Sequence, residues 1–145
     1  MQMRNPEELE AFRWADELVL LVYELTTKFP SEERYGLTSQ IRRAAVSVSS
    51  NLVEGCSRES QVEFRRFVEM SLGSAMELAH QLSLARRVNL CAAKEVDLVE
   101  ERAIRVRKML VGLGKALRAE TGAPRAFRGD GVVGTRNPKP ETPSR

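Results

Sequence analysis

The side chains that most often carry catalysis or bind metals are scarce in this sequence. It has one histidine, His80, and two cysteines, Cys56 and Cys91. Residues 77–80, Glu-Leu-Ala-His, match the Glu-x-x-His element with which helical bundles hold two metal ions. Such a site needs two of these elements and two further glutamates, which a chain with one histidine cannot supply. We therefore expect no bound metal and no other cofactor.

Nucleophilic catalysis lacks suitable residues as well. A nucleophile, a base and an orienting group cannot be assembled from His80 and two cysteines at opposite ends of a predicted helix. That helix has about 30 residues, which at 1.5 Å per residue separates Cys56 and Cys91 by roughly 45 Å, too far for a disulfide within one protomer. No glycine-rich phosphate-binding loop precedes a helix. The sequence predicts a non-enzymatic protein, and an enzyme is the alternative from a different class.

Basic residues are concentrated in one segment. Residues 102–118 contain no acidic residue, and the basic ones are Arg102, Arg105, Arg107, Lys108, Lys115 and Arg118. Arg105, Lys108 and Lys115 fall on the side of the predicted helix opposite its leucines. Two interpretations are open: a phosphate-binding stripe roughly 20 Å long, or a solvated face whose basic side chains cover apolar surface. The formal net charge of +3 permits a nucleic-acid partner without requiring one.

Four predicted helices position these residues, at about 7–28, 37–54, 60–88 and 93–119. A hydrophobic share of 42% with only 6% aromatic residues favours aliphatic helix packing over a β-sandwich, and apolar residues recur at helical spacing in each segment. Ser60 and Glu63 form a capping-box pattern, while Gly55 and Asn89 suit helix ends. Short loops between such helices favour an all-α, antiparallel up-down-up-down four-helix bundle.

The bundle is predicted to occupy residues 1–121. Residues 122–145 are polar, are interrupted by glycine and proline, and are expected to form a disordered tail. The longest strongly apolar run, residues 18–23, is far shorter than the roughly 20 residues that span a bilayer, and no signal segment opens the chain. We expect a cytoplasmic protein with no membrane partner.

The predicted helices carry more apolar surface than one bundle core needs. Apolar side chains cover more than half the circumference of segment 7–28, and the outer faces of the next two helices are small or apolar. These faces predict a cyclic homo-oligomer whose interface contains Arg43, Val46, Ser50, Val53, Met70, Gly73, Glu77 and Leu84. Gly73 permits close backbone approach, and Arg43 can pair with Glu77 within or between subunits. The alternative is that both charges are ordinary surface groups.

A longer pattern is specific enough to resemble a known family. It consists of Phe29-Pro30, Glu33, Tyr35-Gly36-Leu37, Gln40, Arg42-Arg43-Ala44-Ala45, Ser47, Ser50-Asn51, Glu54-Gly55, Phe64, Phe67, Gly73-Ser74 and Glu77-Leu78. Across roughly residues 12–90 the chain resembles the bacterial four-helix-bundle proteins encoded in intervening sequences of large-subunit ribosomal RNA genes. It is more distantly similar to the accessory variability determinant of diversity-generating retroelements, a pentameric basic barrel that partners a reverse transcriptase.

The resemblance implies an up-down four-helix bundle that assembles as a homopentamer, has no known catalysis and associates with nucleic acid. We therefore expect RNA or other nucleic acid to bind the oligomer with little sequence preference. The expected contacts are Arg42, Arg43, Arg102, Arg105, Lys108, Lys115 and Arg118. The alternative is a protein-binding scaffold, such as an accessory subunit of a retroelement reverse transcriptase.

Overall fold

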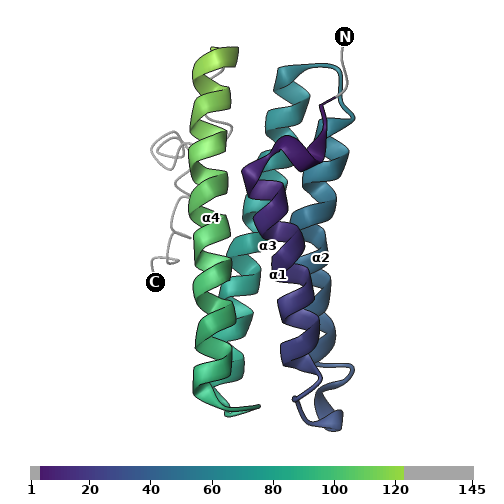
Figure 1. Cartoon of the computed structure of the whole chain (residues 1–145), viewed down its shortest axis with the longest axis vertical. Coiled ribbons are helices and arrows are strands. Elements are labelled where there is room, and N and C mark those ends of the chain that lie inside the picture. The colour runs from purple at the N-terminus through teal and green to yellow at the C-terminus, as the bar shows by residue number, and fades with distance from the viewer. Residues whose placement is uncertain (1–3, 123–145) are drawn as a thin grey trace, which may run out of the picture.

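The computed structural model describes residues 4–122, which form helices and connecting turns without a strand. In chain order the elements are the 3-10 helix η1 (Pro6–Glu8), α1 (Glu10–Thr26), the 3-10 helix η2 (Ser31–Glu33), α2 (Leu37–Cys56), α3 (Gln61–Arg87) and α4 (Ala93–Thr121). Figure 1 shows the four α-helices standing side by side along the long axis of the molecule. The segments predicted to be helical are thus helical, with differences at their ends.

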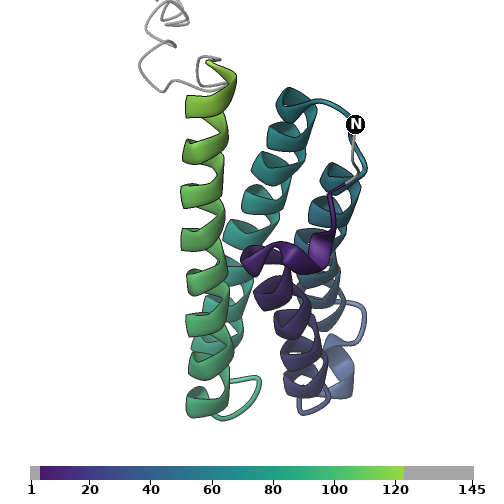
Figure 2. The same ribbon diagram turned by 45° about the horizontal axis from the view of Figure 1, so that its top comes forward.

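Each α-helix packs against two neighbours, as at the corners of a square. α1 contacts α2 and α4, α3 contacts α2 and α4, and within residues 4–122 neither diagonal pair is in contact. Consecutive helices run in opposite directions, as Figure 2 also shows. The predicted antiparallel up-down-up-down four-helix bundle is therefore confirmed. Of the predicted tail, only Gly122 lies within the described residues.

The core is an aliphatic column between the four helices. Its largest fully buried side chains include Leu18, Ile41, Leu52, Leu78, Leu82 and Leu110. Ser71 is the polar residue with the least exposure in this interior. Its hydroxyl donates to the carbonyl oxygen of Val48 at 2.7 Å, so the donor is not left without a partner. In the described part of the chain no helix is long and apolar enough to cross a membrane.

The first helix is shorter than the predicted segment 7–28. Residues Pro6–Glu8 form a 3-10 turn, in which the Asn5 side chain accepts a hydrogen bond from the Glu7 N–H at 3.1 Å. Leu9 then adopts an extended conformation before α1 begins. The prediction of one continuous helix is wrong here, because the closed turn at Pro6 ends in an extended residue that cannot continue a helix. The other end is also shorter, at Thr26.

Ser60 and Asn89 lie at the two ends of α3 as predicted, but among residues 4–122 only one of the two hydrogen bonds of the capping box forms. The Ser60 side chain accepts a hydrogen bond from the Glu63 N–H at 3.1 Å and begins α3. Asn89 has a φ of 57° and lies just after the C-terminal end of α3. These residues mark the two ends of α3, which packs against both α2 and α4.

The two described ends of the chain meet at one end of the bundle. The Gln61 side chain accepts a hydrogen bond from Arg4, and its amide nitrogen donates to Glu120 Oε2 at 2.9 Å. Arg4 also donates to the carbonyl oxygen of Arg58, in the α2–α3 turn, at 2.7 Å. One glutamine at the start of α3 therefore contacts both the segment that precedes α1 and the last turn of α4.

Gly55 does not have the role predicted for it. It was expected to stop the second helix, but it is helical and buried in the last turn of α2. A Cβ atom at this position would lie 2.8 Å from Phe67 Cβ and 3.1 Å from Phe64 Cδ2. Glycine is required because α2 and α3 approach each other closely where the turn joins them, and not because the backbone is left-handed.

This difference predicts opposite effects for the same substitution at two glycines. Gly55→Ala should lower the free energy of unfolding by about 1–3 kcal/mol, because the new methyl group overpacks against Phe67. Gly112→Ala in α4, where a Cβ would meet nothing within 4 Å, should raise it by up to about 1 kcal/mol through helix propensity. Urea unfolding midpoints of the two variants measure both shifts. Shifts in the same direction would contradict the close approach at Gly55.

Candidate nucleic-acid interface

The seam between α1 and α4 is lined with charged side chains. Lys28 Nζ lies 2.5 Å from Glu95 Oε1 near one end of the seam. Hydrogen bonding to Glu95 raises the pKa of Lys28. Further along, Arg102 Nη1 lies 3.9 Å from Glu17 Oε2. Residue numbers rise along α4 as they fall along α1, as expected for antiparallel neighbours.

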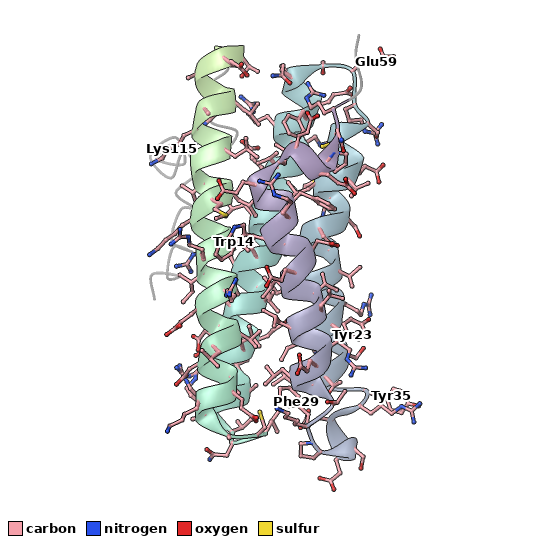
Figure 3. All side chains as sticks on the ribbon, viewed as in Figure 1. Trp14, Tyr23, Phe29, Tyr35, Glu59 and Lys115 are labelled. Carbon is pink, nitrogen blue, oxygen red and sulfur yellow. The ribbon has the colours of Figure 1, made fainter. Side chains whose placement is uncertain are left out.

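Next along this seam, two arginines of α4 stack on one aromatic ring of α1. The guanidinium carbon of Arg102 lies 4.8 Å from the centroid of the Trp14 ring, and that of Arg105 lies 5.4 Å from it. Trp14 is half-buried and lies between α1 and α4 in Figure 3. Cation–π contacts of this kind contribute about 0.5–1 kcal/mol each at exposed sites. They fix the positions of two basic side chains, of which Arg105 was predicted to lie on the side of the helix opposite its leucines.

Lys108 and Lys115 lie on the outer side of α4, where both are exposed. Figure 3 shows Lys115 pointing away from the other three helices. Among residues 4–122, neither lysine has an ion-pair partner within 4 Å, and Arg105 has none either. The three side chains predicted to share one side of this helix are thus all exposed and available to an anion.

Arg118 is placed differently from Lys115. Its Nη1 atom lies 3.6 Å from Glu69 of α3, and the same carboxylate oxygen lies 3.6 Å from Nε of the buried Arg65. Arg65 also donates to the Thr121 hydroxyl at 3.3 Å. Arg118 therefore faces α3 and helps to hold the last turns of α4 against it, so the structure does not bring it together with the outer basic residues.

Arg42 and Arg43 lie on different sides of α2: Arg42 faces α1, and Arg43 faces α3. Arg42 Nε donates to the Thr26 hydroxyl at 2.8 Å, and its guanidinium group stacks over Tyr23 at 4.6 Å from the ring centroid. Arg43 is exposed on the side that faces α3. Because α2 is diagonal to α4 in the bundle, neither arginine joins the basic residues of α4 within one protomer.

A polar hollow of about 430 Å³ lies on the outside of the bundle between α2 and α3. It is lined by Gln40, Arg43, Ala44, Ser47, Ser74 and Glu77. The hydroxyl oxygens of Ser47 and Ser74 are hydrogen-bonded at 2.8 Å, which links the two helices across the hollow. Arg43 and Glu77 both line it, but within the described protomer they form no ion pair; instead, Glu77 accepts a hydrogen bond from Gln81 at 3.1 Å.

The other residues predicted at an oligomer interface lie on the same outer faces of α2 and α3. Val46, Val53 and Met70 are exposed to 38%, 46% and 47%, respectively, and Ser50 is exposed as well. A Cβ atom at Gly73 would meet nothing within 4 Å. Leu84 is half-buried. No contact within the protomer accounts for a glycine at position 73 in the middle of a long helix.

The residues with potential for chemistry are dispersed. His80 is exposed on α3, and among residues 4–122 no three His, Cys, Asp or Glu side chains come together as metal ligands. Cys56 is buried and Cys91 half-buried, and both are free thiols. Burial raises the pKa of each thiol, which reduces the thiolate needed for nucleophilic attack at neutral pH.

Trp14 is the residue that sequence reasoning missed at the α1–α4 seam. It lies one helical turn before Glu17, and these two positions face the basic residues of α4. The helical spacing of Trp14 and Glu17 on one edge of α1 was visible in the sequence. What they contact was not, because it depends on how far α1 is shifted along α4.

Comparisons with known proteins agree with the fold. A family model described as 23S rRNA-intervening sequence protein matches residues 7–112. The crystal structure of a protein with unknown function from the S23 ribosomal protein family of Bacteroides thetaiotaomicron VPI-5482 superposes with a TM-score of 0.68 at 19% identity. The similarity covers 72% of this chain and 98% of that one. No curated protein sequence matches the chain. At this identity the structural likeness shows the fold alone.

The position of Arg118 generates a stability prediction. Glu69→Gln should lower the free energy of unfolding by about 1–3 kcal/mol, because it leaves the buried Arg65 without its counter-charge and releases Arg118. The matched control is Glu54→Gln, which removes an exposed pair with Arg58 at 2.7 Å and should cost less than about 1 kcal/mol. Chemical denaturation of both variants measures the difference. Equal losses would mean that the Glu69 cluster does not anchor the end of α4.

Proposed function

The chain belongs to the 23S rRNA-intervening sequence protein family, and we propose that it is a non-enzymatic homopentamer that binds RNA or other nucleic acid through basic surface residues. The observation that carries the proposal is the set of exposed side chains of Arg105, Lys108 and Lys115 on one side of α4, which have no ion-pair partner among residues 4–122. Neutralising phosphates with such residues releases counterions, which gives binding that depends on salt and little on sequence.

Specific reading of bases is not expected from this surface. The basic side of α4 carries no Asn or Gln that could pair with adenine edges. The ring of Trp14 is covered by two guanidinium groups, so it is not free to stack an unpaired base. The surface therefore suits the phosphate backbone of folded RNA.

Assembly is supported by the outer faces of α2 and α3. They expose apolar side chains such as Val46, Val53 and Met70, together with a glycine at position 73 whose Cβ would meet no atom of the described residues within 4 Å. They also border the hollow lined by Arg43 and Glu77. A ring would repeat the basic residues of α4 once per subunit, so that the summed positive charge attracts phosphates although each subunit has a formal net charge of only +3. Arg42 and Arg43, which are remote from α4 within one subunit, add to this summed charge.

A second candidate is a scaffold that binds another protein, such as an accessory subunit of a retroelement reverse transcriptase. Leu20 on α1 is 68% exposed and Leu98 on α4 is 66% exposed. Leu98 borders a small hollow of about 220 Å³ that Leu21, Leu25 and Val99 also line. Large exposed apolar side chains of this kind favour a protein partner.

The assembly can be tested on its own. Light scattering of the full chain at micromolar concentration should give five times the protomer mass of 16.3 kDa. Val46→Glu combined with Met70→Glu should reduce that mass, because charges would be buried in the interface. Leu98→Glu, an equally drastic change at an exposed residue of α4, is the control and should leave it unchanged. A monomeric mass for the parent chain would refute the oligomer.

Nucleic-acid binding makes a separate prediction. A labelled RNA hairpin should bind the parent chain at low salt, and the logarithm of its affinity should fall with the logarithm of salt concentration by about 1 per phosphate contact. Replacing Arg105, Lys108 and Lys115 together by glutamine should abolish binding while the assembled mass stays the same. Arg13→Gln, Arg34→Gln and Arg87→Gln together, at three exposed residues elsewhere, are the control for net charge and should change affinity little. If the parent does not bind at low salt, the scaffold function is favoured instead.

A further inference from the structure

Arginines are stacked on aromatic rings unusually often in this protein. Among residues 4–122 the pairs are Arg4 with Phe64, Arg34 with Tyr35, Arg42 with Tyr23, Arg58 with Phe67, and both Arg102 and Arg105 with Trp14. Proteins have roughly one significant contact of this kind per 70–80 residues. In this set Trp14 is the ring with two guanidinium groups over it, so two positive charges lie at this ring and one at each of the others.

The two guanidinium groups on Trp14 also differ from most of the other stacked arginines in their hydrogen bonds. Arg4, Arg42 and Arg58 each donate at least one hydrogen bond to another residue of the chain. Within the described residues Arg102 and Arg105 donate none, and neither does Arg34, which lies over Tyr35. Arg102 and Arg105 differ from Arg34 because they share one ring, and the contact of Arg102 with Glu17 is long, at 3.9 Å. A stacked guanidinium uses its flat face on the ring and leaves its N–H donors in the plane free.

This arrangement is incomplete without an anion. Two cations lie over one ring, and among residues 4–122 the carboxylate within 4 Å of either is that of Glu17, which approaches Arg102. The negative face of an aromatic ring offsets part of the repulsion between them, but it provides no hydrogen-bond acceptor. A phosphate group provides both the missing charge and several acceptor oxygens, and arginine binds it through parallel N–H donors.

We propose that Trp14 is a positioning residue that holds Arg102 and Arg105 as a two-arginine clamp for one backbone phosphate of RNA. The clamp rests on the nucleic-acid function proposed above and locates its anchor point at the α1–α4 seam. Lys108 and Lys115 extend the basic surface from the clamp along the outer side of α4. The clamp requires side chains from two helices, so it exists only in the folded bundle.

The test uses the full chain and the same RNA hairpin at low salt. Trp14→Leu removes the ring face but keeps an apolar side chain, and it should weaken binding about 5- to 30-fold, as expected for the loss of two exposed cation–π contacts. Trp14→Phe keeps an aromatic face and should bind within about threefold of the parent. Because neither variant changes the net charge, the salt dependence should stay the same for both. Arg102→Gln should weaken binding and lower the salt slope by about 1.

Two further measurements separate positioning from a general loss of structure. Trp14 is the only tryptophan of the chain, so its fluorescence should change saturably over the RNA concentrations at which the hairpin binds. Glu17→Gln removes the carboxylate that competes for Arg102 and should tighten binding, an effect that damage to the fold would not produce. Thermal unfolding of every variant identifies those that have lost the bundle.

The outcomes distinguish the clamp from the function on which it rests. If Lys108→Gln with Lys115→Gln weakens binding but Trp14→Leu and Arg102→Gln bind like the parent, the clamp is wrong and the basic surface stands. Tryptophan fluorescence that does not respond to saturating RNA would also overturn the clamp. A parent chain that fails to bind RNA at low salt would refute both proposals.

Discussion

Every surface of this protein depends on the burial of one apolar stripe from each of four helices in a common core. Side chains such as Leu18, Leu52, Leu82 and Leu110 are fully buried there, and burying each is worth about 1.5–3 kcal/mol relative to exposure. Connections of a few residues between such helices leave consecutive helices antiparallel. The residues beside each stripe are then forced into the seams, where their partners are set by the shift of one helix along the next.

The sequence therefore predicts which side of each helix is buried better than it predicts which residues of the neighbouring helices that side contacts. Helical spacing alone separates the buried Val106 from the exposed Lys108 and Lys115, so the fold and the outer basic residues could be predicted. Spacing could not predict that Trp14 lies under Arg102, because that contact depends on the register of α1 against α4. The ends of the helices were difficult for a related reason: Gly55 resembles a stop signal locally, but the close approach of α3 explains it.

The arginines of this protein have two different kinds of environment. Arg65 and Arg118 share the carboxylate of Glu69 and join α3 to the end of α4, so their charges are paired within the protein. Arg102 and Arg105 instead lie over the Trp14 ring, and among residues 4–122 they donate no hydrogen bond. The acid-free segment of α4 contains arginines of both kinds. A count of its basic residues therefore cannot tell structural residues from candidates for binding.

The contacts of Gln61 with Arg4 and Glu120 make the two ends of the bundle different from each other. Both described ends of the chain emerge at the end of the bundle where α2 turns into α3, whereas the opposite end consists of the turns between α1 and α2 and between α3 and α4. In a ring whose helices stand parallel to the symmetry axis, one rim would collect Arg4 and Gly122 of every subunit. The other rim would consist of interhelical turns, so the two rims of the assembly would differ.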